Sequence, residues 1–470
     1  MQLLLAISPI IILIITLSIL KIAAHKAAVI SFLFGTIISY FYFGTGVKTI
    51  QCATLNGVKK GLFPIALVII SALYTYGITV SSGAMEKIKE SLKCVSLNEE
   101  VLMLLIICGF GNFMEGMAGF GTSVGVPAAL LVGIGINPYK AVISALIANT
   151  APTAFGSIGV PITTLSDVGC LNPLKLSGVT SAIQLSVMAI VPFCVLFVAN
   201  GFKSIKRYWK LALITDIAFL VPWWGIAKFV GCELPDIIGG ISVMLVLGFF
   251  GRDDKHTKNI TFKSVMYAWL PFSLVVFALS ILAFVPSEYK ISPGIVIFIA
   301  ATIGGLLQKL SPLRLVKEFY QTFLKYHKAI VTICMVLALS KVMDESGMIK
   351  VMATALVDST GRFVAFFSPL VGALGGFVTG SGTSSSVLFG GLQVDTAKNL
   401  GFSPEWFAAA NVMGAGIGKM ISPQSIAIGA AATSLIGKEG DILKKTFMYF
   451  VPIIIWASLI CGLLANIKLD

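Results

Sequence analysis

The chain has 470 residues, of which 57% are hydrophobic and only 12% are charged, and its formal net charge is +13. A soluble domain carries about 25% charged residues, so this composition excludes a soluble globular protein and predicts a polytopic membrane protein. The surplus Lys and Arg residues fall in short loops, which is typical of cytoplasmic loops, so the positive charge does not indicate nucleic-acid binding.

Long uncharged stretches recur along the chain, for example at 62–82, 178–201 and 446–466. Each is close to the length of about 20 residues that crosses a bilayer as a helix. No strand-like alternation accompanies them. We therefore expect an all-α polytopic membrane protein with about 12–14 transmembrane segments. The first of these, within residues 1–24, lacks a basic start and a small-residue cleavage site, so it predicts a membrane helix and not a cleaved signal peptide.

The first unusual stretch, residues 108–125, holds six glycines and the carboxylate of Glu115 between strongly apolar flanks. These glycines include Gly116, Gly119 and Gly121. Each glycine costs roughly 1 kcal/mol against alanine inside a helix, so the stretch predicts a broken or re-entrant helix. Broken backbone survives at membrane depth only where protein buries it or where it lines a wet cavity. Glu115 is therefore a candidate functional group, and we expect it to bind a coupling proton. A glycine-rich packing face is the alternative interpretation.

A second glycine-rich break is predicted around Gly380 and Gly382, where hydroxyl side chains follow. The hydroxyls belong to Ser381, Thr383, Ser384, Ser385 and Ser386, and of these we single out Thr383, Ser384 and Ser385. Amide groups at a helix start, together with hydroxyls, form a neutral cradle for an anion. We therefore expect these three side chains to contact a substrate. A polar external loop is the alternative, although the apolar flanks argue against it.

Each break is followed by a helix and a further interruption, and the two sets match in register. The matched pairs are Gly116 with Gly380, 264 positions apart, and Asn149 with Asn411 and Pro161 with Pro423, each 262 apart. Proline interrupts a helical hydrogen-bond ladder, and asparagine can bond the carbonyls that this frees. The series predicts an N-terminal helix in 1–24, a first repeat in 25–200, a middle membrane section in 201–289 and a second repeat in 290–470.

Loop charges predict the relative orientation of these repeats. The loops 83–100 and 309–328 are placed inside by their lysines and arginines, and the acidic loop 231–236 is placed outside. The loop 347–363 follows 309–328 by one crossing, so it falls outside, although it corresponds to 83–100. The repeats are therefore expected to be inverted, as in secondary transporters, whose substrate site lies at the repeat interface. A duplication kept for folding alone is the alternative.

Lys419 is a charge that only one repeat carries, since Ser157 stands at the equivalent position. Glu115 is likewise matched by Thr379. A charge that the shared backbone plan does not require is a candidate for function, and a buried ammonium needs an anion. We expect Lys419 to bind a substrate carboxylate, or Glu115 when the site is empty; a lysine that snorkels to the membrane surface is the alternative. The other candidate substrate-binding residues are Thr383, Ser384, Ser385, Asn149, Asn411 and Gln424.

Four motifs together resemble the L-lactate permease family of bacteria, whose members also take up glycolate. They are Glu-Gly-Met-Ala-Gly-Phe-Gly at 115–121, Leu-Ile-Ala-Asn-Thr-Ala-Pro at 146–152, Thr-Gly-Ser-Gly-Thr-Ser-Ser at 379–385 and Gly-Lys-Met-Ile-Ser-Pro-Gln-Ser-Ile-Ala at 418–427. The resemblance extends over nearly the whole chain. It implies a multi-pass symporter of the bacterial inner membrane that carries protons with L-lactate, glycolate or related 2-hydroxy monocarboxylates. The chain departs from the family pattern at Gly382, where members usually have an aspartate.

Other classes of function find little support in the sequence. It contains no His-Glu-x-x-His motif, no paired metal ligands and no nucleophile elbow, so we expect no enzyme, no metal site and no cofactor. The expected partners are a small carboxylate, a proton and the lipid bilayer, without nucleic acid. An anion channel, or a transporter of another small organic anion, remains the alternative, since helix breaks also build selectivity filters.

Overall fold

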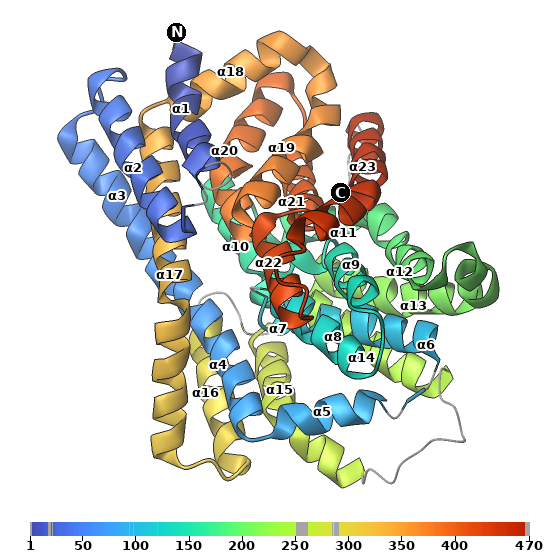
Figure 1. Cartoon of the computed structure of the whole chain (residues 1–470). Coiled ribbons are helices and arrows are strands. Elements are labelled where there is room, and N and C mark those ends of the chain that lie inside the picture. The colour runs from blue at the N-terminus through green and yellow to red at the C-terminus, as the bar shows by residue number, and fades with distance from the viewer. Residues whose placement is uncertain are drawn as a thin grey trace.

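The computed structural model describes residues 2–250 and 262–465, apart from gaps at 17–19, 21, 94, 97, 120, 284 and 286–290. Helices make up nearly all of this part of the chain, and no strand occurs in it (Figure 1). Eight of the described helices are long and apolar enough to cross a membrane, and six shorter apolar helices accompany them. The prediction of an all-α polytopic membrane protein is confirmed.

The first half of the chain is a succession of helices with several interruptions. In order these are α1 (Gln2–Ile14), α2 (Ala24–Phe41), α3 (Val47–Lys60), the π-helical η2 (Gly61–Ala66), α4 (Leu67–Ser81), α5 (Ala84–Lys93), α6 (Glu99–Met103), the π-helical η3 (Leu104–Gly111), α7 (Asn112–Met117), α8 (Thr122–Gly133), α9 (Pro138–Ala148), the short 3-10 turn η4 (Pro152–Ala154), α10 (Gly156–Gly169), α11 (Pro173–Met188) and α12 (Val191–Asn200).

Longer helices dominate the remainder. They are α13 (Phe202–Phe229), α14 (Pro235–Phe250), α15 (Phe262–Ala283), α16 (Pro293–Leu307), α17 (Pro312–Glu345), α18 (Met348–Thr360), the 3-10 turn η6 (Gly361–Phe363), α19 (Val364–Thr379), α20 (Gly382–Leu400), α21 (Pro404–Lys419), α22 (Pro423–Ala432) and α23 (Glu439–Leu464). The middle section packs against the first half: α13 lies on α11 and α12, α14 on α7 and η3, and α15 on α4 and α5.

Besides α16, where Ser292 precedes proline without a capping hydrogen bond, five helices begin with an Asn or Ser side-chain cap followed by proline. They are α9, α11, α17, α21 and α22, with caps at Asn137, Asn172, Ser311, Ser403 and Ser422. Each cap side chain accepts a hydrogen bond from an amide of the first turn, and proline lacks only an amide hydrogen that would have no partner there. Among the helices that follow a break or interruption, α22 carries this signal, whereas α8, α10 and α20 begin without it.

Helices that correspond in the two halves pack reciprocally. α8 follows the first break and packs on α22, while α20 follows the second break and packs on α10. Because α8 corresponds to α20 and α10 to α22 in the sequence register, these two contacts are equivalent. Reciprocal packing of this kind is what a pseudo-two-fold axis between repeats requires. We propose on this basis that the chain is divided into repeats at 25–200 and 290–470 around the middle section 201–289.

The corresponding helices α5 and α18 lie at opposite ends of the molecule, α5 at the lower end and α18 at the upper end in Figure 1. Each directly follows a long helix, α4 or α17 respectively. If the membrane lies between these ends, the two helices face opposite compartments. This arrangement supports inverted repeats.

Cysteine labelling tests the inverted orientation. Glu90→Cys on α5 and Ala355→Cys on α18 are expected to react with a membrane-impermeant thiol reagent from opposite sides of the membrane. The exposed native thiols of Cys52 and Cys170 are first replaced by serine to remove background labelling. Reaction of both introduced cysteines from the same side would contradict the inverted topology.

Glycines bring α19 and α21 into backbone contact. A Cβ on Gly418 of α21 would lie 1.9 Å from the backbone oxygen of Ala373 on α19, and one on Gly376 of α19 would lie 2.0 Å from that of Ala415 on α21. No larger side chain fits at either position without separating the helices. This close packing positions the end of α21, and with it Lys419, against the end of α19.

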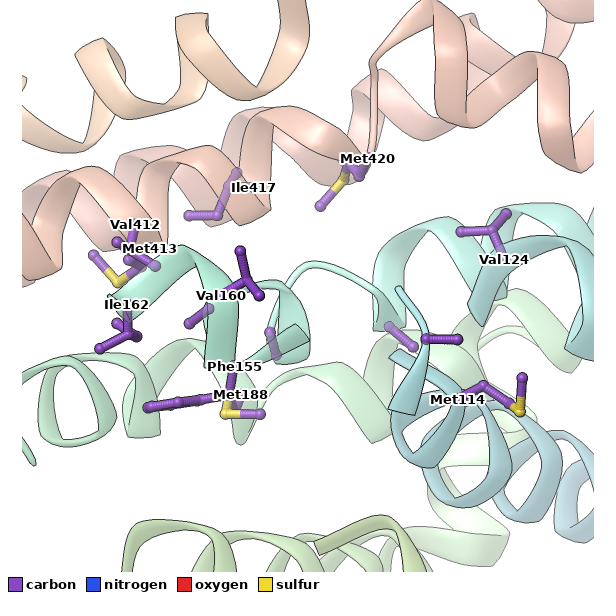
Figure 2. Packing of buried hydrophobic residues seen from close by; sticks show 14 of the residues in the cluster. Met114, Val124, Phe155, Val160, Ile162, Met188, Val412, Met413, Ile417 and Met420 are labelled. Atoms are coloured by element: carbon purple, nitrogen blue, oxygen red, sulfur yellow. The ribbon is translucent and has the colours of Figure 1, made fainter. Parts of the chain in front are cut away.

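The opposite side of α21 packs on α10 through apolar side chains. Val412, Met413 and Ile417 of α21 face Val160 and Ile162 of α10 (Figure 2). All five are buried. Since α21 belongs to the second half of the chain and α10 to the first, this contact joins the two halves beside the site described next.

Candidate functional site

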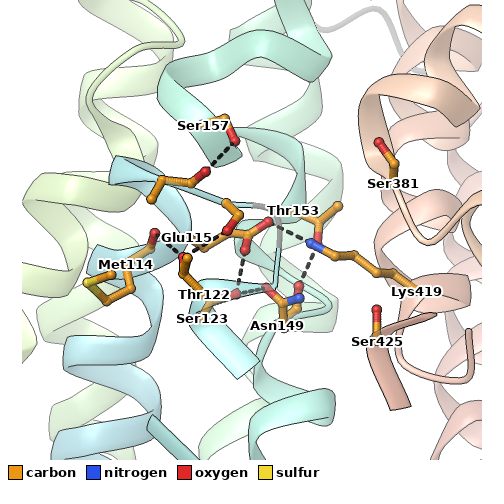
Figure 3. Close-up of polar contacts among 12 residues, drawn as sticks. Met114, Glu115, Thr122, Ser123, Asn149, Thr153, Ser157, Ser381, Lys419 and Ser425 are labelled. Atoms are coloured by element: carbon orange, nitrogen blue, oxygen red, sulfur yellow. Dashed lines mark hydrogen bonds and ion pairs between the residues drawn. The ribbon is translucent and has the colours of Figure 1, made fainter. Parts of the chain in front are cut away.

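Glu115 and Lys419 form a buried ion pair that joins the two halves of the chain (Figure 3). The Lys419 ammonium donates a hydrogen bond to Glu115 Oε1 at 2.7 Å, although 304 positions separate the residues in sequence. The side chain of Lys419 is only 6% exposed and that of Glu115 only 3%. A buried charge costs several kcal/mol unless it is paired, so each residue depends on the other or on a ligand that replaces it.

Two polar side chains complete the pair. Ser123 donates to the second oxygen of Glu115, Oε2. Asn149 satisfies both ends of its amide when Oδ1 faces Lys419: Oδ1 then accepts from the ammonium at 3.1 Å, and Nδ2 lies 3.0 Å from Glu115 Oε2. The carboxylate therefore has three donors and the ammonium two acceptors, as a stable buried ion pair requires.

The break beside Glu115 is made by glycines in left-handed conformation. α7 ends at Met117, and the chain turns through Gly119 (φ +58°) and Gly121 (φ +84°) before α8 begins. Residues other than glycine rarely adopt such angles. Gly116 instead lies inside α7, where a Cβ would lie 2.8 Å from Cβ of Asp236 on α14. From the sequence, Gly116 was predicted to form part of the break. In the structure it instead permits close packing of α7 on α14.

The second interruption of the first half holds strained backbone. Ser157, Ile158 and Gly159 have φ of +48°, +61° and +73°. A left-handed conformation is a true outlier for a β-branched residue such as Ile158, and strain of this kind concentrates at functional sites. The Ser157 hydroxyl donates to the backbone oxygen of Ala118 at 3.1 Å, which ties this interruption to the break beside Glu115.

A cavity of about 300 Å³ lies against the ion pair and is lined by both breaks and both interruptions. Hydroxyl side chains supply much of its polar lining, namely Thr153, Ser157, Thr379, Ser381, Thr383, Ser384 and Ser425. The volume is at the lower end of ligand pockets, which hold roughly 300–1,000 Å³. A second wall carries His25 of α2 with Lys325 and Lys328 of α17, so the surroundings favour an anion.

Most of the side chains named from the sequence meet at this cavity. Glu115, Lys419, Thr383, Ser384 and Gln424 line it, as do Gly121, Gly380, Gly382 and Pro161, while Asn149 bonds the ion pair. Gly380 ends α19 in left-handed conformation, and Pro423 is the first residue of α22. At Gly382 a Cβ would lie 2.8 Å from Cγ2 of Thr153, so the position of Gly382 leaves little room for a side chain.

Ser385 and Asn411 are not brought to the cavity. The Ser385 hydroxyl donates to the backbone oxygen of Gly372 at 3.1 Å. Asn411 is fully buried where α21 meets α19, and its side-chain amide has no hydrogen-bond partner among the described residues. These contacts do not support the prediction that Ser385 and Asn411 bind the substrate.

Sequence reasoning did not single out Ser123 or Thr153 as site residues. Ser123 lies eight positions beyond Glu115, and only the turn at Gly119 and Gly121 returns it to the carboxylate. The spacing itself carries no such signal, because in an unbroken helix two residues eight apart are about 12 Å apart along the axis.

Paired halves whose interrupted helices meet around a small polar cavity, at a charge pair shared between the halves, are the arrangement of secondary transporters. Fold and site together place the protein in that class of membrane proteins. Within it, the chain belongs to the L-lactate permease family, whose model matches residues 2–291 and 287–468.

Individual relatives agree with this assignment. The chain is 36% identical to the L-lactate permease of Streptococcus iniae, over 87% of this chain and 93% of the relative. It is 31% identical to the glycolate permease GlcA of Escherichia coli K12, over 97% and 94% of the two chains. Among solved structures, MtrF of Neisseria gonorrhoeae, described with a class of antimetabolite efflux pumps, shares the fold with a TM-score of 0.55 at 16% identity, over 97% and 98% of the two chains.

Proposed function

We propose that the protein imports L-lactate, and glycolate or related 2-hydroxy monocarboxylates, together with protons across the inner membrane of a bacterium. Relatives that match most of the chain are L-lactate and glycolate permeases. The observation that carries the proposal is the buried Glu115–Lys419 pair at the wall of a small cavity rich in hydroxyls. A single ammonium beside hydroxyl groups matches a short acid with one carboxylate and one hydroxyl.

The substrate carboxylate is expected to replace Glu115 as the partner of Lys419. In the empty site Glu115 is already paired with the Lys419 ammonium, so an incoming anion competes with Glu115 for that ammonium. Once displaced, an ionised Glu115 would be buried without a cation, and binding a proton removes that cost. Binding of one anion is thereby linked to binding of one proton, and the charge of the site stays at zero.

The linkage also accounts for the return of the empty carrier. When substrate and proton have left on the inner side, Glu115 and Lys419 pair again and neutralise each other. A carrier with either charge unpaired would have to move an uncompensated charge through the membrane interior, which is costly. Only the fully loaded and the fully empty states are therefore expected to change orientation.

Uptake into proteoliposomes tests the proposed function. Labelled L-lactate should accumulate in a saturable manner when the outside is more acidic, and one proton should enter with each anion. Because cotransport of one proton with one anion carries no net charge, a membrane potential imposed with potassium and valinomycin should drive little uptake at equal pH. An anion channel would behave in the opposite way. Uptake that follows the potential and ignores the pH gradient would contradict the proposal.

The hydroxyls of the second break offer a matched comparison. Thr383→Ala and Ser384→Ala should each raise the KM for L-lactate by about 2- to 10-fold, the cost of one neutral hydrogen bond. Ser385→Ala is the control, since this neighbouring hydroxyl bonds Gly372 and does not line the cavity. The KM of all three variants is measured in the uptake assay. An unchanged KM in Thr383→Ala and Ser384→Ala, or an equal rise in Ser385→Ala, would remove this loop from the site.

A further inference from the structure

A second carboxyl group is buried behind Glu115, and it comes from the middle section of the chain. Asp236 is the second residue of α14 and is only 1% exposed. The sequence places it in an external acidic loop, but the helix begins at Pro235 and packs on α7. The contact is close because Gly116, next to Glu115 in α7, has no side chain: a Cβ there would lie 2.8 Å from Cβ of Asp236.

Asp236 has too few partners for a buried carboxylate. The indole N–H of Trp223 donates to Oδ1 at 2.8 Å, and Oδ2 has no hydrogen-bond partner among the described residues. Glu115, by comparison, has three donors, one of them a cation. An ionised carboxylate with a single neutral donor is strongly disfavoured in a buried site, whereas a protonated carboxyl group needs far less compensation. The geometry therefore favours a proton on Oδ2.

Packing couples this carboxyl to the ion pair. Trp223 contacts Phe155 edge to face, with ring centroids 5.2 Å apart. Phe155 directly precedes Gly156, where a Cβ would lie 2.7 Å from Glu115 Oε1. Trp223 thus links the Asp236 carboxyl to the wall that holds the Glu115 carboxylate.

Charges that face Asp236 come from both halves of the chain. Glu115 on α7 and Lys419 on α21 interact with it electrostatically. Asp216 of α13 and Cys108 of η3 instead line a separate small cavity. Among the described residues, Lys419 is the cation that pairs with Glu115 and also interacts electrostatically with Asp236. Two ionised carboxylates beside it would leave a negative charge uncompensated, so only one of them is ionised at a time.

We propose that Asp236 is a second proton-binding carboxyl group of the transport cycle and passes its proton to Glu115. This inference rests on the proposed proton-coupled transport. In the empty carrier Glu115 is ionised and paired, and Asp236 holds a proton. When a substrate anion takes Lys419, the proton on Asp236 moves to the displaced Glu115 carboxylate. Asp236, now ionised, then takes the coupling proton from outside, so one proton has entered for one anion.

Asp236→Asn separates proton transfer from substrate movement. Asparagine keeps the acceptor for Trp223 but cannot bind or release a proton. Exchange of internal for external lactate needs no net proton movement, so we expect it to stay within about twofold of wild type, while accumulation driven by a pH gradient falls by about 10-fold or more. Asp216→Asn is the matched control, a buried carboxyl group on α13 that is 7% exposed and lines the separate cavity; it should accumulate lactate normally.

Trp223→Phe provides an independent readout. It removes the donor that favours the ionised form of Asp236, so the pH profile of uptake should move to higher pH by about 1 unit, the value of one hydrogen bond to a charged group. Normal accumulation by Asp236→Asn, loss of its lactate exchange together with accumulation, or an unchanged pH profile in Trp223→Phe would each overturn the inference. Wild-type accumulation is measured separately, so these failures leave the proposed function standing.

Discussion

Lys419→Ala should abolish lactate uptake, with a loss of about 100-fold or more in kcat/KM. The change removes the ammonium that binds the substrate carboxylate, and truncating one member of a buried charge pair typically costs 2–5 kcal/mol or more. Lys419→Arg should restore only part of the activity. The planar guanidinium is larger, and the end of α21 that carries it is held by backbone contact between Gly418 and α19. Uptake of labelled lactate at several concentrations gives both constants.

A double variant separates stability from recognition. In Lys419→Ala alone, Glu115 is buried without its cation, so the protein should also be less stable to heat. Adding Glu115→Gln removes the unpaired charge and should recover most of the thermal stability, but not the uptake. A well-inserted Lys419→Ala protein with wild-type affinity for lactate would show that this lysine does not bind the substrate.

Glu115→Gln should uncouple lactate movement from the proton gradient. Glutamine resembles the protonated carboxyl group, so Lys419 stays free for the substrate, but the side chain can no longer take up or release a proton. Exchange of internal for external lactate should therefore persist and depend little on pH, while net accumulation falls by about 10-fold or more, because the empty carrier would have to return with Lys419 unpaired. The measurement is the ratio of internal to external lactate under an imposed pH gradient.

Ser123→Ala is the control for this prediction. It removes one hydrogen bond to Glu115 Oε2 and leaves the carboxyl group in place. Accumulation should persist in this variant, with a moderate loss of rate or affinity. If Glu115→Gln accumulates lactate against its gradient with the pH dependence of wild type, Glu115 does not carry the coupling proton.

Features that depend on local backbone were predictable from the sequence. Gly119, Gly121 and Gly380 turn the chain with positive φ, a requirement that glycine alone meets easily. The Glu115–Lys419 contact was predictable as one of two options, because a charge that lies in an apolar stretch needs a partner wherever it is in the sequence.

Features that depend on helix rotation and tertiary packing were not predictable. Thr383, Ser384 and Ser385 are consecutive on α20, and successive residues of an α-helix point about 100° apart. They cannot all face one cavity, and only the packing of α20 decides that Ser385 turns towards Gly372. The prediction for Asp236 was wrong for a similar reason. A short acidic segment indicates a solvated loop, whereas Asp236 is buried because it packs against Gly116, which is distant in the sequence.

Backbone contact between α19 and α21 has a consequence for alternating access. Helices that touch through Gly376 and Gly418 have no side chains between them that would allow them to slide, so they should move as one rigid body. Gly380 at the end of α19 and Lys419 at the end of α21 then form a half-site of constant shape. The opposing half-site holds Glu115 and Asn149. Switching between outward and inward states should therefore rotate the two half-sites as rigid units about the Glu115–Lys419 contact, so that this pair stays intact in the empty carrier.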